Sequence, residues 1–216
     1  MPIFFQHTIN DRTRLGIWKI EEQESFFLQK VPLKQHVSHP YKRLQHLAGR
    51  TLLPELFHDF PLDEIMIADT RKPFLENEKY HFSISHCGNF AAAIASSEER
   101  VGVDIELVTP RLKNIAHKFL TEQEKRYLEQ WSALSALYLQ MLTIVWSSKE
   151  AIFKWYGNGS VDFRRDMALD GAIVFEPGEW ISVPFVFRKH GPVKLKIHAR
   201  TFDGLVMAFV VSRIKV

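Results

Sequence analysis

The 216-residue sequence contains a single cysteine, Cys87, so neither an intrachain disulfide nor a cysteine-based metal cage is possible. This favours a reducing compartment. The most apolar helical segment, Ala133–Trp146, is interrupted by Ser135, Gln140 and Thr143, and is better interpreted as a core helix than as a membrane span. The N-terminus lacks the basic and apolar regions of a signal peptide. We therefore expect a soluble, cytoplasmic protein with no membrane partner.

The sequence also lacks dense runs of lysine and arginine, RNA-binding signatures, low-complexity segments and visible repeats. The formal net charge is only +3, which permits an anionic ligand or partner and does not indicate nucleic acid. Hydrophobic residues make up 46% of the chain and charged residues 25%, as in ordinary globular proteins. The length suffices for one large domain or two small ones.

Apolar periodicity predicts a mixture of strands and helices. We expect strands over residues 3–8, 15–20, 80–85, 90–95, 101–107, 172–175, 181–187, 193–199 and 205–212, and helices over 40–53, 121–131 and 134–156. Pro54 should stop the first helix, a capping box from Thr121 to Glu124 should open the second, and Gly157 should end the third. This order predicts an α+β fold with an N-terminal half, residues 1–100, and a C-terminal half, residues 101–216.

Two short acidic segments carry most of the functional information. The first is Gly102-Val103-Asp104-Ile105-Glu106, which reads as a strand with Asp104 and Glu106 on one face. The second is Trp146-Ser147-Ser148-Lys149-Glu150-Ala151-Ile152-Phe153-Lys154, which reads as a helix with Trp146, Glu150 and Lys154 on one stripe. A hard divalent cation bound by a few carboxylates and by phosphate oxygens would explain both segments.

These segments resemble the two signature motifs of the Sfp-type 4′-phosphopantetheinyl transferases, GxDxE and WxxKEAxxK, at every fixed position. Weaker matches occur in the family's order along the chain. They are Gly49-Arg50-Thr51-Leu52-Leu53, Lys72-Pro73-Phe74-Leu75, Phe82-Ser83-Ile84-Ser85-His86, and Phe119-Leu120-Thr121 leading to Glu124. The resemblance covers most of the chain from Lys42 to Lys154.

The resemblance implies an enzyme that moves the phosphopantetheine arm of coenzyme A onto a serine of an apo acyl or peptidyl carrier protein. The larger members of the family are pseudo-dimers in one chain: two similar α/β subdomains, mostly antiparallel sheets with packed helices, and a site in the cleft between them. The N-terminal half would then supply the side that binds the coenzyme A phosphates, and the C-terminal half the metal and catalytic acids. We also expect a monomer.

The resemblance also implies roles for individual residues. Asp104, Glu106 and Glu150 would hold Mg²⁺ against the coenzyme A pyrophosphate. We expect Glu150 to act as the general base and Lys154 to meet the phosphates or the leaving group. The nucleotide part of coenzyme A would be bound by further basic and polar residues, which are Arg43, Arg50, Arg71, Lys72, Ser85 and His86.

Other interpretations remain open. Asp104 and Glu106 would alone be a solvated strand face, and Glu150 with Lys154 an ordinary surface ion pair. Trp146 is expected to be a core anchor outside the site. The competing functions are a non-catalytic relative that binds coenzyme A or a carrier, and a metal-dependent phosphohydrolase. We also expect Cys87 to be structural, and Lys113 and Lys118 to face an acidic carrier protein.

Overall fold

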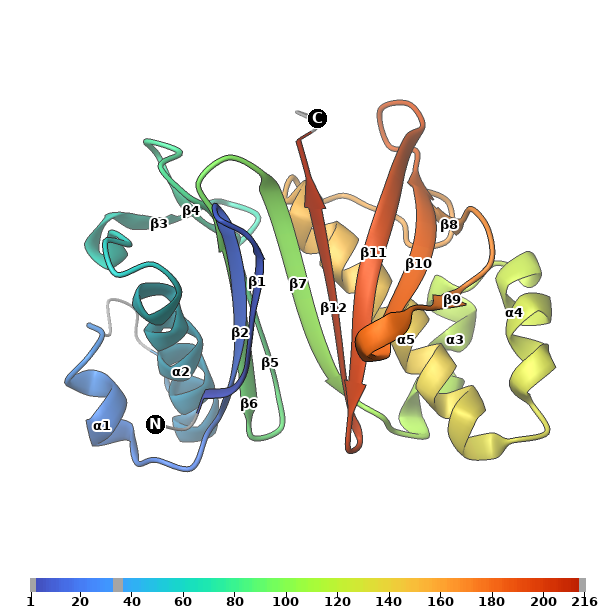
Figure 1. Ribbon diagram of the computed structural model, residues 1–216, viewed down its shortest axis with the longest axis horizontal. Coiled ribbons are helices and arrows are strands. Elements are labelled where there is room, and N and C mark those ends of the chain that lie inside the picture. Colours follow the sequence, from blue (N-terminus) through green and yellow to red (C-terminus); the bar gives the residue numbers. More distant parts are fainter. Residues whose placement is uncertain (1–2, 33–36, 214–216) are drawn as a thin grey trace.

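The computed structural model describes residues 3–32 and 37–213. Its two large sheets are antiparallel and are hydrogen-bonded as separate units, and each is covered on its outer face by a long helix (Figure 1). The layers follow the order helix, sheet, sheet, helix. This arrangement confirms the α+β prediction and repeats one pattern, a sheet with a long helix, in each half of the chain.

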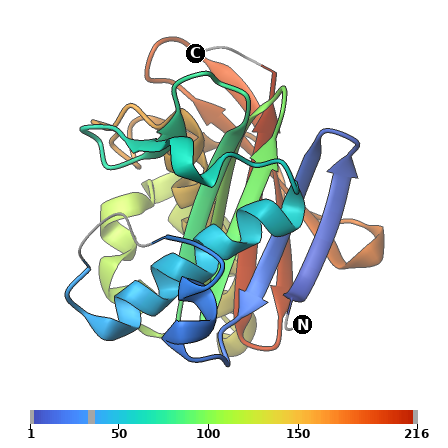
Figure 2. The ribbon, with the colours of Figure 1, turned by 90° about the vertical axis from the view of Figure 1, so that its left-hand side faces the viewer.

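The first sheet has the strand order β1-β2-β6-β5. Its strands are β1 (Ile3–Asn10), β2 (Thr13–Lys19), β5 (His81–Cys87) and β6 (Phe90–Ser96). The helices of this half are the short α1 (Glu24–Leu28) and the longer α2 (Pro40–Leu56), which crosses the outer face of the sheet (Figure 2). A buried cluster that includes Trp18, Leu47, Leu52 and Phe82 joins α2 to the sheet.

The helix α2 begins at Pro40, as expected, but does not stop at Pro54. Pro54 lies inside the last turn, and the helix continues to Leu56. A proline in this position removes only one backbone donor, and the burial of Leu53 and Leu56 favours the final turn. The prediction of the helix end was therefore wrong.

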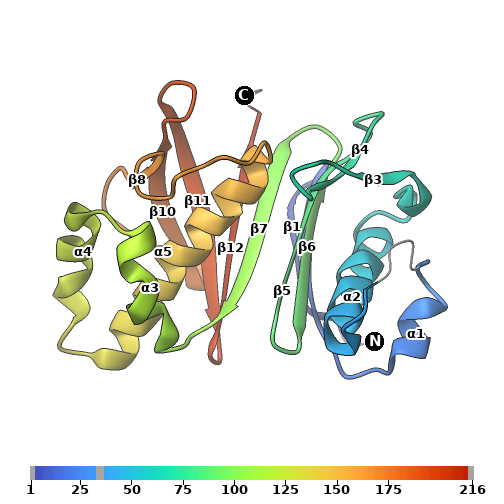
Figure 3. The same cartoon turned by 180° about the vertical axis from the view of Figure 1, so that it is seen from behind.

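The second sheet has the order β7-β12-β11-β10-β8, and β9 pairs with β10. Its strands are β7 (Arg100–Leu107), β8 (Met167–Leu169), β9 (Val174–Phe175), β10 (Trp180–Phe187), β11 (Val193–Phe202) and β12 (Leu205–Ser212). Its helices are α3 (Arg111–Phe119), α4 (Glu122–Leu128) and α5 (Ser135–Tyr156). Figure 3 shows α5 lying across this sheet. There are also short 3₁₀ turns, which are η1 (Leu62–Glu64), η2 (Glu129–Trp131) and η3 (Pro177–Glu179).

Most predicted elements are confirmed. The capping box at Thr121 and Glu124 forms, and Gly157 caps α5 in the left-handed conformation with φ 75°. The predicted second helix is shorter than expected, because α4 gives way to the 3₁₀ turn η2. The sequence analysis missed α1, α3, β8 and the small hairpin of β3 (Ile65–Ile67) and β4 (Pro73–Leu75). All of these are short.

A third core lies between the two sheets, which face each other through β2, β6, β7 and β12. From β7 it contains the expected apolar face, Val101, Val103 and Ile105, all of which are buried. The opposite face of β7, with Gly102, Asp104 and Glu106, is therefore directed towards α5. Within the described residues, no helix is long and apolar enough to cross a membrane.

Candidate active site

The two sheets meet at a seam between β5 and β7, two strands that run side by side (Figure 3). Here side chains of β5, rather than backbone carbonyl groups, accept hydrogen bonds from the backbone N–H groups of β7. The Ser83 hydroxyl accepts from the backbone N–H of Val103 (3.2 Å) and the Ser85 hydroxyl from Ile105 (3.3 Å). The Cys87 thiol accepts from Leu107 (3.4 Å). Because these residues alternate along β5, they form a side-chain ladder that joins the two halves.

Gly102 explains how α5 approaches β7 so closely. A Cβ atom at this position would lie 2.1 Å from the Ala151 carbonyl oxygen and 2.7 Å from the Trp155 backbone nitrogen. Backbone atoms in the middle of a helix cannot yield to such an overlap, so the position requires glycine. The glycine of the first motif thus brings the Glu150 turn of α5 next to the Asp104 carboxylate.

Asp104 is 3% exposed and lies at the centre of the site. Its Oδ1 accepts from the Ser85 hydroxyl (2.8 Å) and pairs with the Lys154 ammonium (2.7 Å), and its Oδ2 accepts from the Ser147 hydroxyl (2.9 Å). Lys154 also donates to the Ser85 oxygen (2.7 Å). Asp104 therefore joins β5, β7 and α5 through two hydroxyl donors and one ammonium.

Glu106 follows Asp104 by two residues on β7, and each of its two carboxylate oxygens accepts a hydrogen bond. The Trp146 indole N–H donates to Oε1 (3.1 Å), and the Cys87 thiol donates to Oε2 (3.4 Å). Burial, followed by the charge of Asp104, raises the pKa of Glu106.

Glu150 is the least compensated of the three acids. Burial is the largest cause that raises its pKa to about 7, and the charges of Asp104 and Glu106 add to it, whereas Lys154 acts in the opposite direction. No described residue donates a hydrogen bond to Glu150. The predicted i, i+4 stripe therefore faces the acids of β7, and Lys154 contacts Asp104 and Ser85 rather than forming a solvated surface pair with Glu150.

The chemistry of this donor set fits a hard divalent cation, since carboxylate oxygens are its preferred ligands and the mutual repulsion at Glu150 would be relieved by positive charge. Over residues 3–32 and 37–213, however, no three His, Cys, Asp or Glu side chains form a group ready to hold a metal. The ammonium of Lys154 is instead the positive charge in contact with Asp104.

The residues expected to bind coenzyme A fall into different surroundings. Ser85 touches Asp104 and Lys154. His86 follows it on β5, and partial desolvation of its ring, followed by the charge of Lys154, lowers the pKa of His86. Arg50 is buried in α2, and its charge, like that of His86, acts on His46 between them. With burial as the largest cause, these charges lower the pKa of His46 to about 4. Arg50 and His86 therefore lie on the same side of the seam.

Lys72 lies beyond Lys154, at the C-terminal end of α5. Its ammonium donates to the backbone oxygen of Trp155 (3.4 Å), and burial, followed by the charge of Arg100, lowers the pKa of Lys72 to about 8. A cavity of about 440 Å³ opens beside it, lined by residues of β4, β5, β7 and the end of α5. Its lining includes Lys72, Pro73, Phe74, Arg100 and Asn158.

Arg43 and Arg71 lie away from the acids. Arg43 is two turns before Arg50 and forms an ion pair with Glu24 of α1 (2.7 Å). Arg71 is exposed in the turn before β4, with φ 66°. As far as the described residues extend, neither forms a hydrogen bond or an ion pair with Asp104, Glu106 or Glu150.

Sequence reasoning missed several residues at the site. Trp146 was expected to be only a core anchor, but its indole N–H contacts Glu106, so that expectation was incomplete. Ser147 and Cys87 also contact the acids, and the seam role of Ser83 had no signal except the alternation of small polar residues along β5. Lys149, inside the second motif, was given no role and proves to be fully buried.

Comparisons with known proteins agree with these motifs. The sequence model of the 4′-phosphopantetheinyl transferase superfamily matches residues 100–206. The chain is 31% identical to 4′-phosphopantetheinyl transferase AcpT of Escherichia coli O157:H7 over 131 residues, covering 59% of this chain and 65% of the relative. It is 29% identical to enterobactin synthase component D of Escherichia coli (strain K12), covering 62% of this chain and 63% of the relative.

A more distant similarity reaches L-aminoadipate-semialdehyde dehydrogenase-phosphopantetheinyl transferase of Xenopus laevis, at 28% identity over 52% of this chain and 43% of the relative. The matches thus span just under two thirds of the length of these two Escherichia coli relatives.

Proposed function

Because the chain belongs to the 4′-phosphopantetheinyl transferase superfamily, we propose that it transfers the phosphopantetheine arm of coenzyme A to a serine of an apo acyl or peptidyl carrier protein. The serine oxygen forms a bond to phosphorus, the pyrophosphate bond breaks, and adenosine 3′,5′-bisphosphate leaves. The observation that carries the proposal is the packing of Asp104, Glu150 and Lys154 around one point of the seam.

We assign Asp104, Glu106 and Glu150 to the binding of Mg²⁺. Support comes from the donor set, which is made of carboxylate oxygens alone, and from the absence of any described hydrogen-bond donor at Glu150. When bound, Mg²⁺ supplies neutralisation of the pyrophosphate charge. The residues of β7 and α5 orient the donor, and the buried seam limits access of water.

Glu150 is the proposed general base for the carrier serine. A serine hydroxyl is a weak nucleophile at neutral pH and needs a neighbouring proton acceptor. In the metal-free chain the pKa of Glu150 is about 7, and the charge of bound Mg²⁺ would lower it, so that the carboxylate is ionised and able to accept a proton at neutral pH. Such a base contributes about 10²–10⁴-fold to the rate.

Lys154 is proposed to contact the phosphates. An ammonium group has three N–H donors, and among the described residues two of them are used, at Asp104 and Ser85. The third can reach a phosphate oxygen. Ser85 donates its own proton to Asp104, so a supporting role, in which Ser85 holds both Asp104 and Lys154, agrees best with its contacts.

The remaining basic residues suit the nucleotide part of coenzyme A. Arg50 of α2 and His86 of β5 both lie near enough to His46 for their charges to act on it, and Lys72 lines the 440 Å³ cavity, which offers both basic and apolar groups to a nucleotide. Arg43 and Arg71 would contribute only from the periphery. Binding of coenzyme A between the two halves of one chain is also compatible with a monomer.

An acidic carrier protein would meet the face formed by α3, which lies beside α5 in Figure 3. Lys113 and Lys118 are exposed on this helix. Positive charge on this face would speed the encounter with an acidic partner.

The direct test incubates the protein with Mg²⁺, coenzyme A and a panel of apo carrier proteins, and measures the carriers by mass spectrometry. We expect one phosphopantetheine arm to be added. No mass gain on any carrier from the same cell would refute the proposal. Tight coenzyme A binding without transfer would support a non-catalytic binding protein, and breakdown of coenzyme A without a carrier would support a phosphohydrolase.

The role of Glu150 is tested by Glu150→Gln, which keeps the shape of the side chain and removes its basicity. We expect turnover to fall by about 10²-fold or more, while coenzyme A still binds. The matched control is Glu122→Gln on the exposed surface of α4, which should transfer at the wild-type rate. A normal rate in Glu150→Gln would exclude it as the base.

A further inference from the structure

Trp146 lies one helical turn before Glu150 and is clamped between two aromatic rings. The ring centroids of Phe119 and Phe163 are 4.9 Å and 5.6 Å from that of Trp146. These two rings come from the end of α3 and from the segment between α5 and β8. The indole cannot turn between them without losing both contacts, so the direction of its N–H bond is defined.

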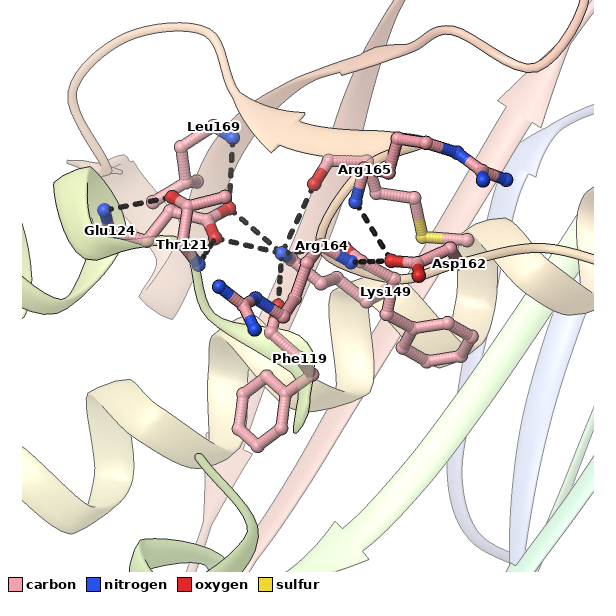
Figure 4. Close-up of polar contacts among 10 residues, drawn as sticks. Phe119, Thr121, Glu124, Lys149, Asp162, Arg164, Arg165 and Leu169 are labelled. Carbon is pink, nitrogen blue, oxygen red and sulfur yellow. Dashed lines mark hydrogen bonds and ion pairs between the residues drawn. The ribbon is translucent and has the colours of Figure 1, made fainter. Parts of the chain in front are cut away.

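The clamp is held together by Lys149. Its ammonium is 0% exposed, donates to the backbone oxygen of Phe119 (2.6 Å) and pairs with the Glu124 carboxylate (2.9 Å) (Figure 4). It also donates to the backbone oxygen of Phe163 (3.0 Å). The residues whose backbones are fixed by Lys149 are therefore the residues whose rings contact Trp146. A single buried ammonium thus connects both walls of the clamp.

The fixed indole N–H points to Glu106, where it donates to Oε1 at 3.1 Å. The other oxygen, Oε2, is contacted by the Cys87 thiol. A carboxylate that accepts a hydrogen bond on each oxygen has a fixed plane. It is therefore already oriented before a cation binds, and loses little rotational freedom on binding. Partners that orient a ligand in this way commonly change metal affinity or activity by about 10- to 100-fold when they are removed.

We propose that Trp146 is a positioning residue that holds the Glu106 carboxylate ready for a divalent cation, with Lys149 maintaining its clamp. The inference rests on the proposed function, because it takes Glu106 as a metal ligand. Packing alone would need only the indole ring, whereas positioning needs its N–H group. The two roles therefore separate in a variant that keeps an aromatic ring and removes the N–H.

The chain contains a matched control in the same helix. Trp155 is 0% exposed, and no described residue accepts a hydrogen bond from its indole nitrogen. Trp146→Phe and Trp155→Phe remove the same atoms from two rings of α5, of which Trp146 is partly buried and Trp155 fully buried. Only the first substitution removes a hydrogen bond to an acid of the site.

The first measurement is Mn²⁺ binding, followed by electron paramagnetic resonance without coenzyme A or carrier. We expect Trp146→Phe to raise the dissociation constant about ten-fold or more, and Trp155→Phe to leave it within about two-fold of the wild type. Equal effects of the two substitutions, or wild-type affinity in Trp146→Phe, would overturn the inference. So would a wild-type protein that binds no Mn²⁺.

The second measurement follows metal binding in the wild-type chain and uses the two variants only to assign its resonances. The protein contains five tryptophans, which can be labelled with 5-fluorotryptophan and followed by ¹⁹F NMR. Mg²⁺ should shift the resonance that is missing in Trp146→Phe more than the one that is missing in Trp155→Phe. An unmoved Trp146 signal would refute the inference. Failure of the wild type to modify a carrier would instead refute the proposed transferase.

Discussion

Replacement of Lys149 by methionine should be among the most destabilising single changes in this chain. The ammonium is 0% exposed and its partner Glu124 is 3% exposed, and its three N–H donors are shared among four acceptors within hydrogen-bonding distance: the Glu124 carboxylate and the backbone oxygens of Phe119, Phe163 and Met167. Methionine keeps an unbranched chain of similar volume, so the change removes charge and donors rather than packing. Glu124 would be left with a buried, uncompensated charge.

Removal of one member of a buried ion pair costs about 3–5 kcal/mol of unfolding free energy. For a chain of this size each kcal/mol lowers the melting temperature by roughly 2–4 °C, so we expect a decrease of roughly 6–20 °C. Glu124 also accepts from the backbone N–H groups of Thr121 and Leu169, so it caps α4 and joins α4 to β8, and its pair with Lys149 connects both to α5. The loss should therefore loosen the whole C-terminal half.

Urea denaturation, followed by circular dichroism and by fluorescence, measures this cost if the two transitions coincide. Lys125→Met is the control, because Lys125 pairs with Glu122 on the surface at 2.7 Å, where such a pair contributes only about 0.2–1 kcal/mol. Adding Glu124→Gln to Lys149→Met should recover part of the loss, since it removes the unpaired charge. A cost in Lys149→Met no greater than in Lys125→Met would refute the reasoning.

Two further predictions concern the acids and their approach. Without metal, the contribution of Glu150 to stability should fall as the pH rises from about 4.5 to about 7, because burial and the charge of Asp104 raise the pKa of Glu150 to about 7 and the folded chain then holds a proton that the unfolded chain has released. Urea titrations across this range test it, and an unchanged slope in Glu150→Gln would contradict it. Gly102→Ala should lower the free energy of unfolding by about 2 kcal/mol or more and slow transfer, because the added Cβ would overlap the backbone of α5. Gly16→Ala should lower it less, because the two atoms nearest to the added Cβ are side-chain carbons of Leu52 and Leu56, at 3.3 and 3.4 Å. Equal urea midpoints for these two variants would argue against the steric role.

Local patterns in the sequence predicted the parts of the site that lie within one element. Alternation along the strand was enough to separate Val103 and Ile105 from Asp104 and Glu106, because side chains of an extended chain point to opposite faces. The 3.6-residue period in the same way placed Glu150 and Lys154 on one stripe of α5, and the caps at Thr121 and Gly157 were predicted from adjacent residues.

Contacts between elements were decided only by the tertiary structure. The ladder of Ser83, Ser85 and Cys87 joins strands whose paired residues are 20 positions apart, and the hydrogen bond from Trp146 to Glu106 spans 40 positions. The four acceptors around Lys149 lie on α3, on α4, on the segment between α5 and β8, and on β8. The periodicity of a sequence does not contain this information. It shows on which face of a helix or strand a residue lies, but not which group of another element lies opposite to that face.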